Sequence, residues 1–160
     1  MKIHLLRHSK TEKISSTGKD FDRKLMEKGV RQSSEMLKFL ELKSFENTNL
    51  YYSSAQRTKE TFDLACSKFK FNQISFHREL YLAGLEELLH FIWNLKIQND
   101  IFIIGHNEGL SELASYLSGS FIHLKTSGYI QLEFACESSE EISKDSRIIP
   151  QSLLISSDDS

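Results

Sequence analysis

Residues 3–9 read Ile3-His4-Leu5-Leu6-Arg7-His8-Ser9, an apolar run that stops abruptly on an arginine and a histidine. Apolar residues in such a run are typical of a buried strand, whereas Arg7 and His8 need solvent or a polar partner. We therefore expect a strand over residues 2–6 that presents a cation and an imidazole at the edge of a sheet.

Two other apolar runs end near residues of the same kinds. Residues 101–106 read IFIIGH and end on His106, and the run at residues 50–53 is followed by Arg57. In open parallel sheets, ligands bind beyond the carboxyl ends of the strands. Arginine matches phosphoryl oxygens with its planar fork, and the first turn of a helix also favours an anion. The three strand ends together predict one site for an anion such as phosphate.

Strands and helices are expected to alternate along the chain, with a polar loop at residues 10–20. This alternation predicts an α/β fold, a three-layer α/β/α sandwich with a mostly parallel central sheet. The first helix should lie on the surface, because its stripe of Val30, Ser34, Leu37 and Leu40 or Glu41 is thin. Ser54 is expected to cap the second helix. The predicted strands are 2–6, 50–53, 73–76, 100–104 (the central one) and 129–135, and the predicted helices are 27–42, 55–69, 85–92 and 110–117.

The length of 160 residues favours one domain, which we place at residues 1–150 with a serine-rich, acidic tail at 151–160. A net charge of −2 gives no overall field for nucleic acid or an anionic membrane, so neither is expected as a partner. Cys66 and Cys136 are isolated, which argues against a disulfide framework or a zinc site and favours a cytoplasmic protein. We expect no signal peptide, membrane span, metal or cofactor.

Several side chains could attack the phosphorus of a bound phosphoryl group. Cys66 is expected on the packed face of its helix without a basic partner, and a serine would need a base at hydrogen-bonding distance. A neutral imidazole such as His8 or His106 can attack directly and form a phosphohistidine intermediate. Arg7 and Arg57 should disfavour the imidazolium form and keep His8 nucleophilic near neutral pH.

Five motifs occur in a fixed order along the chain. They are residues 6–9 (LRHS), 22–29 (DRKLMEKG), 53–61 (SSAQRTKET), 79–80 (EL) and 105–110 (GHNEGL). In this order and spacing the chain resembles the histidine phosphatase superfamily, which has the fold of cofactor-dependent phosphoglycerate mutase. Within it, the chain looks most like the small SixA-type phosphohistidine phosphatases.

This resemblance implies a role for each residue of the motifs. His8 would be the nucleophile, while Arg7, Arg57 and His106 would bind the phosphoryl group and stabilise the transition state. Glu79 matches a proton donor of larger relatives. Four residues depart from the family pattern. Ser9 replaces a glycine beside the phosphate, where its hydroxyl could add a contact to the substrate. Lys24 replaces a proline and Met26 a threonine, which should affect stability more than chemistry. Glu108 replaces a proline and should point to solvent or pair with a base.

The first function hypothesis is a metal-independent phosphatase that hydrolyses phosphohistidine in a protein, or a related phosphoramidate or phosphomonoester, through a phosphohistidine intermediate on His8. The short chain leaves little sequence for a lid, which favours a phosphorylated protein over a small phosphorylated substrate. The alternatives are a small-metabolite phosphomonoesterase or mutase of the same superfamily, and a non-catalytic phosphate-binding module. A basic loop near the site is expected to be a solvated face that could steer an acidic or phosphorylated partner; its members are Lys10, Lys13, Lys19, Arg23 and Lys24.

Overall fold

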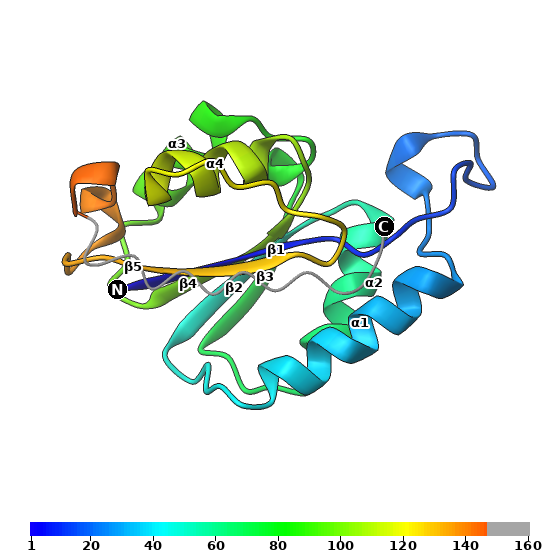
Figure 1. Cartoon of the computed structure of the whole chain (residues 1–160), viewed down its shortest axis with the longest axis horizontal. Coiled ribbons are helices and arrows are strands. Elements are labelled where there is room, and N and C mark those ends of the chain that lie inside the picture. The colour runs from blue at the N-terminus through cyan, green and yellow to red at the C-terminus, as the bar shows by residue number, and fades with distance from the viewer. Residues whose placement is uncertain (147–160) are drawn as a thin grey trace.

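The structure is a computed structural model that describes residues 1–146. Five strands and four α-helices alternate along the chain, as the sequence predicts (Figure 1). The strands are β1 (Lys2–Arg7), β2 (Thr48–Ser53), β3 (Gln73–His77), β4 (Asp100–Gly105) and β5 (Tyr129–Glu133), and the helices are α1 (Glu27–Leu40), α2 (Gln56–Ala65), α3 (Leu85–Leu95) and α4 (Gly109–Ser118).

The strands form one sheet in the order β3-β2-β4-β1-β5. The pairs β1–β4, β2–β4 and β2–β3 are parallel, and only β5 runs antiparallel, along β1. The strand predicted to be central, β4, is the middle strand of the five, and its residues 101–105 are buried. Arg7 at the end of β1 is paired with Gly105 at the end of β4, so these two strands end at the same level.

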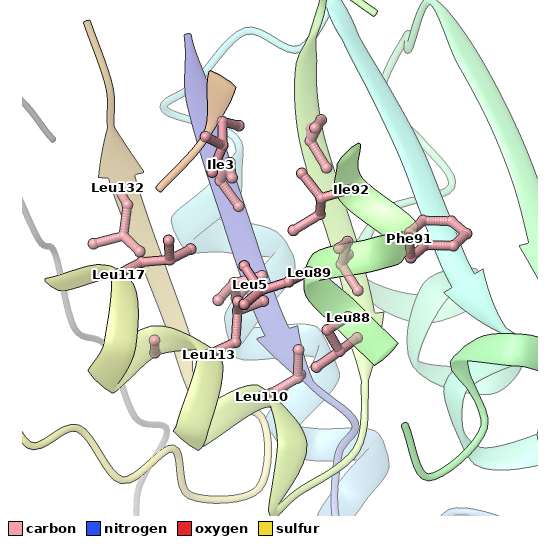
Figure 2. Close-up of a cluster of buried hydrophobic side chains, with 14 of the residues drawn as sticks. Ile3, Leu5, Leu88, Leu89, Phe91, Ile92, Leu110, Leu113, Leu117 and Leu132 are labelled. Carbon is pink, nitrogen blue, oxygen red and sulfur yellow. The ribbon is translucent and has the colours of Figure 1, made fainter. Parts of the chain in front are cut away.

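Helices cover both faces of the sheet, which confirms the three-layer α/β/α sandwich. Helices α3 and α4 lie on one face, and α1 and α2 on the other (Figure 1). Successive residues of β1 alternate between the two layers: Leu5 packs in the cluster under α3 and α4, while Leu6 packs with Met36 of α1. Figure 2 shows Leu89 of α3 and Leu110 of α4 in the same cluster as Leu5. The sheet is thus fixed from both sides.

The buried face of α1 shares Leu40 with the predicted stripe but otherwise differs from it. Val30 is 41% exposed, and the buried residues are Gly29, Gln32, Ser33, Met36 and Leu40. The apolar pattern missed this face because its first half is held by polar contacts. The Gln32 side chain accepts a hydrogen bond from the backbone N–H of Lys10, and an added Cβ at Gly29 would lie 2.0 Å from the Lys10 carbonyl oxygen.

The predicted cap of α2 was wrong. The helix begins at Gln56, Ala55 occupies the cap position, and the buried Ser54 hydroxyl has no hydrogen-bond partner among the described residues. Thr58 stabilises this end instead, because its hydroxyl lies 2.6 Å from the carbonyl oxygen of Ser53 and 2.8 Å from that of Ala55. The helix also ends at Ala65, four residues before the predicted end at 69.

The part of the chain that the structure describes contains no helix with the length and apolarity needed to cross a membrane. The predicted tail at residues 151–160 lies outside the described residues. The division into a domain over residues 1–150 and a tail therefore stays a prediction.

Candidate active site

The predicted site residues follow the carboxyl ends of three parallel strands. Arg7 ends β1 and His8 directly follows it. Arg57 lies in the first turn of α2 after β2, and His106 directly follows β4. The backbone N–H of His8 donates to the Gly105 carbonyl at 3.1 Å, which holds the end of β1 against β4. The structure brings these side chains together as the sequence predicts: Arg57 Nε lies 3.3 Å from His8 Nε2, and the rings of His8 and His106 are 5.3 Å apart.

The contacts of His8 determine which ring nitrogen carries its lone pair. Nδ1 lies 2.8 Å from the carbonyl oxygen of Ser9. A carbonyl oxygen can only accept, so Nδ1 carries the proton and the neutral ring has its lone pair on Nε2. Arg57 Nε donates to that lone pair. His8 Nε2 is therefore a basic nitrogen aimed at a guanidinium, where an anion would also be attracted.

The surroundings of His8 keep its ring neutral. Burial lowers its pKa well below the ordinary value, and the nearby His106, Arg57 and Arg7 add to this effect. The Ser9 carbonyl acts in the opposite direction but does not outweigh burial. The expectation that neighbouring arginines keep His8 unprotonated is thus consistent with this geometry, although burial is the larger cause.

His106 is buried next to His8. Its Nε2 lies 2.8 Å from the Ser53 hydroxyl, and the edge of its ring meets the Tyr81 ring with centroids 5.4 Å apart. Burial, followed by the charge of Arg57, lowers the pKa of His106 to about 3, so this imidazole is also neutral near pH 7. Its Nδ1 is buried and has no partner among residues 1–146, which leaves one ring nitrogen able to bind a further group.

Arg57 is held by an acid that sequence reasoning missed. Its Nη1 donates to the Asp20 carbonyl oxygen at 2.8 Å, and its Nη2 donates to the Asp20 carboxylate at 2.9 Å. The Tyr81 hydroxyl donates to the same carboxylate at 2.6 Å. Burial alone would raise the pKa of Asp20, but the bonds from Tyr81 and Arg57 outweigh it and lower the pKa. Asp20 is therefore ionised near neutral pH.

The segment that carries Asp20 docks beside the site through aromatic contacts. The rings of Phe21 and Tyr81 meet edge to face with centroids 5.0 Å apart, and the Arg78 guanidinium lies 4.6 Å from the centre of the Phe21 ring. Residues 10–20 are a polar stretch, and nothing in that pattern distinguishes Asp20 from the other acids of the chain. Its function depends on contacts with Arg57 and Tyr81, which lie 37 and 61 positions further along the chain.

Arg7 is held in place by the backbone at Leu124. Its Nη1 donates to the Leu124 carbonyl at 3.0 Å, and the Asn107 amide donates to the same oxygen at 2.9 Å. Burial lowers the pKa of Arg7, but a guanidinium remains charged near neutral pH. The buried Nε of Arg7 has no partner in the described part of the chain. Glu108 is exposed, as its place in the motif predicts.

Ser9 does not use its hydroxyl in the way the sequence suggests. It is fully buried, and its Oγ lies 2.7 Å from Ser33 Oγ on α1. Its backbone N–H donates to the Thr61 hydroxyl at 3.0 Å. The serine in place of glycine therefore joins the end of β1 to α1 and α2, and its hydroxyl is engaged away from His8.

The structure does not bring Glu79 to this site. Its carboxylate is 68% exposed and lies 3.4 Å from His77 Nδ1. It lines a separate cavity of 440 Å³ together with His90 and Phe91 of α3. The proton-donor role that the family resemblance implies for Glu79 gains no support from this position.

A cavity of 730 Å³ opens directly in front of His8. Among residues 1–146, no three His, Cys, Asp or Glu side chains are grouped so as to bind a metal ion. Most of the groups in reach of a ligand are cations, an imidazole and hydroxyls, and Glu12 is the carboxylate of the lining. The cavity is lined by Arg7, His8, Lys10, Thr11, Glu12, Lys13, Arg23, Met26, Arg57 and Thr126.

Comparison with known families agrees with the motifs. Residues 3–88 match the family described as the histidine phosphatase superfamily (branch 1). This match covers more than half of the chain and includes the segments that carry Arg7, His8 and Arg57. No curated protein matches the chain at a significant level.

Solved structures show the same fold. A candidate SixA phosphohistidine phosphatase from Nakamurella multipartitia aligns over 97% of this chain and 95% of its own, with a TM-score of 0.81 and 18% identity. Another, from Agrobacterium tumefaciens, aligns over 83% and 91%, with a TM-score of 0.71 and 22% identity. The protein histidine phosphatase SixA complexed with tungstate aligns over 97% and 94%, with a TM-score of 0.73 and 14% identity.

Proposed function

The chain belongs to the histidine phosphatase superfamily and is an enzyme of the phosphatase class, and from this premise we propose that it hydrolyses phosphohistidine in a protein. Related phosphoramidates and phosphomonoesters would be secondary substrates. One observation carries the proposal: His8 presents an unprotonated Nε2 to Arg57, because Nδ1 is held by the Ser9 carbonyl. A buried, neutral imidazole beside two guanidinium groups is suited to attack an anionic phosphoryl group.

In the proposed first step, His8 Nε2 donates its lone pair to phosphorus and the bond from phosphorus to the leaving nitrogen breaks. The phosphoryl group moves to His8. The leaving imidazole departs as a neutral ring, because solvent water supplies a proton to its other ring nitrogen. Arg7 and Arg57 neutralise the charge on the phosphoryl oxygens. Arg7 donates through its Nε. Arg57 donates through nitrogens that exchange their bonds to His8 and Asp20 for bonds to the anion. His106 donates through its otherwise unpartnered Nδ1.

In the second step, water attacks the phosphorus of the intermediate on His8. The bond from phosphorus to Nε2 breaks, the electron pair returns to His8, and inorganic phosphate leaves. The Ser9 carbonyl keeps Nδ1 protonated during both steps. Because the same nitrogen regains its lone pair, the enzyme is ready for another cycle without a cofactor.

The positions of the nearby acids favour a phosphohistidine substrate. In the described residues, Asp20 is ionised by its bonds to Tyr81 and Arg57, and Glu79 lies at a different cavity. Glu12 lines the cavity, but it is exposed and its carboxylate has no contact with His8 among residues 1–146. An alkoxide leaving group needs a strong acid at hydrogen-bonding distance, whereas an imidazole leaves with less help. We therefore rank phosphohistidine above phosphomonoesters of simple alcohols.

The other hypotheses receive less support from the site. A mutase must protect its phosphohistidine from water, and the cavity in front of His8 is open enough to have exposed residues such as Glu12 and Lys13 in its wall. A non-catalytic binder has no need for a neutral, oriented imidazole.

The buried Cys66 and half-buried Cys136 are free thiols, so the cytoplasmic location expected from the sequence is kept as part of the proposal.

The test is release of inorganic phosphate from a phosphohistidine carrier protein and from p-nitrophenyl phosphate. We expect the wild type to act on both, with a higher kcat/KM for the phosphohistidine protein. The His8→Ala variant should lose activity by several orders of magnitude. Equal activity of wild type and variant would exclude attack by His8.

A further inference from the structure

The cavity in front of His8 is larger than a phosphoryl group requires. Its 730 Å³ lies within the range of sites for whole small molecules, about 300–1,000 Å³. Arg7 and Arg57 lie next to His8 and account for the phosphoryl end. The rest of the wall must therefore face the leaving group of the substrate.

This remaining wall is positively charged. It contains Lys10, Lys13 and Arg23, and its acidic member is Glu12. The whole chain carries a net charge of −2, so the positive charge is local to this wall. A concave surface lined by one sign of charge selects ligands of the opposite sign.

The wall is ordered by backbone pairing. Thr11 and Leu25 form an antiparallel bridge, and hydrogen bonds of 2.9 and 3.0 Å join Glu12 to Lys24 and Met26 to Lys10. Residues 10–12 and 24–26 thus form two short, paired segments. The N–H of Lys10 is also held by Gln32 of α1 at 2.9 Å. Lys10 therefore starts from a fixed backbone position on the cavity wall, and Lys13 directly follows the paired segment.

The cations of this wall have unused binding capacity. Among residues 1–146, no carboxylate lies within 4.0 Å of the ammonium group of Lys10 or Lys13. Arg23 donates to the Thr11 hydroxyl and, at 3.2 Å, to Asp20, while its buried Nε has no partner in the described part of the chain. A buried N–H group without a partner is unusual and is satisfied when a ligand oxygen accepts from it.

We propose that Lys10, Lys13 and Arg23 form a second anion subsite, which binds a carboxylate or phosphate carried by the leaving group of the substrate. The inference rests on the proposed function only in placing the phosphoryl group at His8. It narrows the substrate class to phosphorylated compounds or side chains with a second anionic group nearby. In a phosphohistidine protein, this group would be an acidic residue that flanks the phosphohistidine.

The test compares ligands that differ in one carboxylate, with a His8→Asn variant used to prevent turnover. Calorimetry measures the dissociation constants of 3-phosphoglycerate and glycerol 3-phosphate. We expect 3-phosphoglycerate to bind about tenfold more tightly, which corresponds to about 1.4 kcal/mol. Adding Lys10→Gln and Lys13→Gln should reduce the ratio of the two dissociation constants to about two or less.

The matched control removes the same charge from the same loop. Lys19 and Lys24 are exposed and do not line the cavity, so Lys19→Gln with Lys24→Gln should preserve the tenfold ratio. An equal loss in both double variants would assign the preference to the general field of the loop and overturn the subsite. A ratio near one in the protein with all lysines intact would overturn it as well.

A second experiment, with the wild-type enzyme, tests whether the second anionic group can be an acidic residue beside the phosphohistidine. Two synthetic phosphohistidine peptides are compared, one with glutamates beside the phosphohistidine and one with glutamines. We expect kcat/KM to be about tenfold higher for the acidic peptide and this preference to vanish in the Lys10→Gln, Lys13→Gln enzyme. Equal values in the wild type would exclude an acidic protein flank as the ligand. If neither small phosphate binds and neither peptide reacts, the proposed function fails together with the subsite.

Discussion

Asp20 holds two nitrogens of the Arg57 guanidinium, at 2.8 Å through its carbonyl oxygen and at 2.9 Å through its carboxylate. The third nitrogen, Nε, donates to His8 at 3.3 Å. Every nitrogen of Arg57 is therefore engaged before a substrate arrives. A phosphoryl group that binds Arg57 must take over some of these bonds, and Asp20 is an anion that competes with it.

The first prediction concerns this competition. Asp20→Asn removes a negative charge next to the phosphoryl site, so inorganic phosphate and vanadate should inhibit about three- to tenfold more strongly, as expected for loss of one nearby charge. The measurement is the inhibition constant at fixed ionic strength. Asp22→Asn serves as the control, because Asp22 accepts a bond from Thr17 and does not contact Arg57. Weaker inhibition of the Asp20 variant would mean instead that Asp20 orients Arg57.

Buried histidines should make the stability depend on pH. Burial first of all lowers the pKa of His4 and of His106 to about 3, and that of His8 well below its ordinary value. In the unfolded chain these groups titrate near 6.5, so the unfolded state binds more protons as the pH falls below that value. The free energy of unfolding should therefore decrease from pH 6.5 downward, with an uptake of about three protons near pH 5.

Urea unfolding across this pH range measures the proton uptake. His4→Phe should reduce it by about one proton, whatever the effect on absolute stability, because His4 is buried against Tyr129 with Nδ1 2.6 Å from the Tyr129 hydroxyl oxygen. An uptake that does not change in this variant would show that His4 is already protonated in the folded protein.

The serine that replaces the family glycine should stabilise the site through Ser33. Ser33→Ala removes the partner of the buried Ser9 hydroxyl at 2.7 Å, and we expect a loss of about 1–3 kcal/mol in the free energy of unfolding. Ser34→Ala is the matched control, since Ser34 is exposed on the same helix and should change stability by less than about 0.5 kcal/mol. Equal effects of the two substitutions would contradict this role for Ser9.

The close approach of α1 to the cavity wall should not tolerate a side chain at Gly29. A Cβ there would lie 2.0 Å from the Lys10 carbonyl oxygen, so Gly29→Ala must displace either α1 or the segment that carries Lys10. We expect a loss of about 1–3 kcal/mol in unfolding free energy and a lower kcat/KM. At Gly84 the nearest atom is a side-chain oxygen of Glu87 at 3.7 Å, so Gly84→Ala should be the milder substitution. A stable, active Gly29→Ala enzyme would show that this contact is dispensable.

The sequence was a good guide to the parts of the fold that depend on local patterns. Apolar runs that end on polar residues located β1 and β4, and the same transitions placed Arg7, His8 and His106 at one edge of the sheet. These predictions were possible because a buried strand and its polar end are both visible over a few consecutive residues.

The features of the fold and of the site that the sequence did not predict depend on contacts between distant segments. The first half of the buried face of α1 is set by Gly29 and Gln32 against Lys10, so the apolar periodicity correctly placed Leu40 inside but also predicted Val30 there. Asp20 gains its role only when residues 20, 57 and 81 meet in the folded chain. Glu79 was placed by motif resemblance, but a motif does not determine whether the carboxylate faces His8 or His77.

The central claim is that His8 Nε2 carries the phosphoryl group during turnover. The most direct measurement is rapid quenching of the enzyme with a phosphohistidine substrate, followed by mass spectrometry of the peptide that contains His8 under alkaline conditions. We predict a phosphoryl group on His8 that appears before free phosphate, disappears as substrate is consumed, and is absent in His8→Ala. Phosphate release by the wild type with no phosphoryl group on His8 at any time, or with full activity in His8→Ala, would contradict the mechanism.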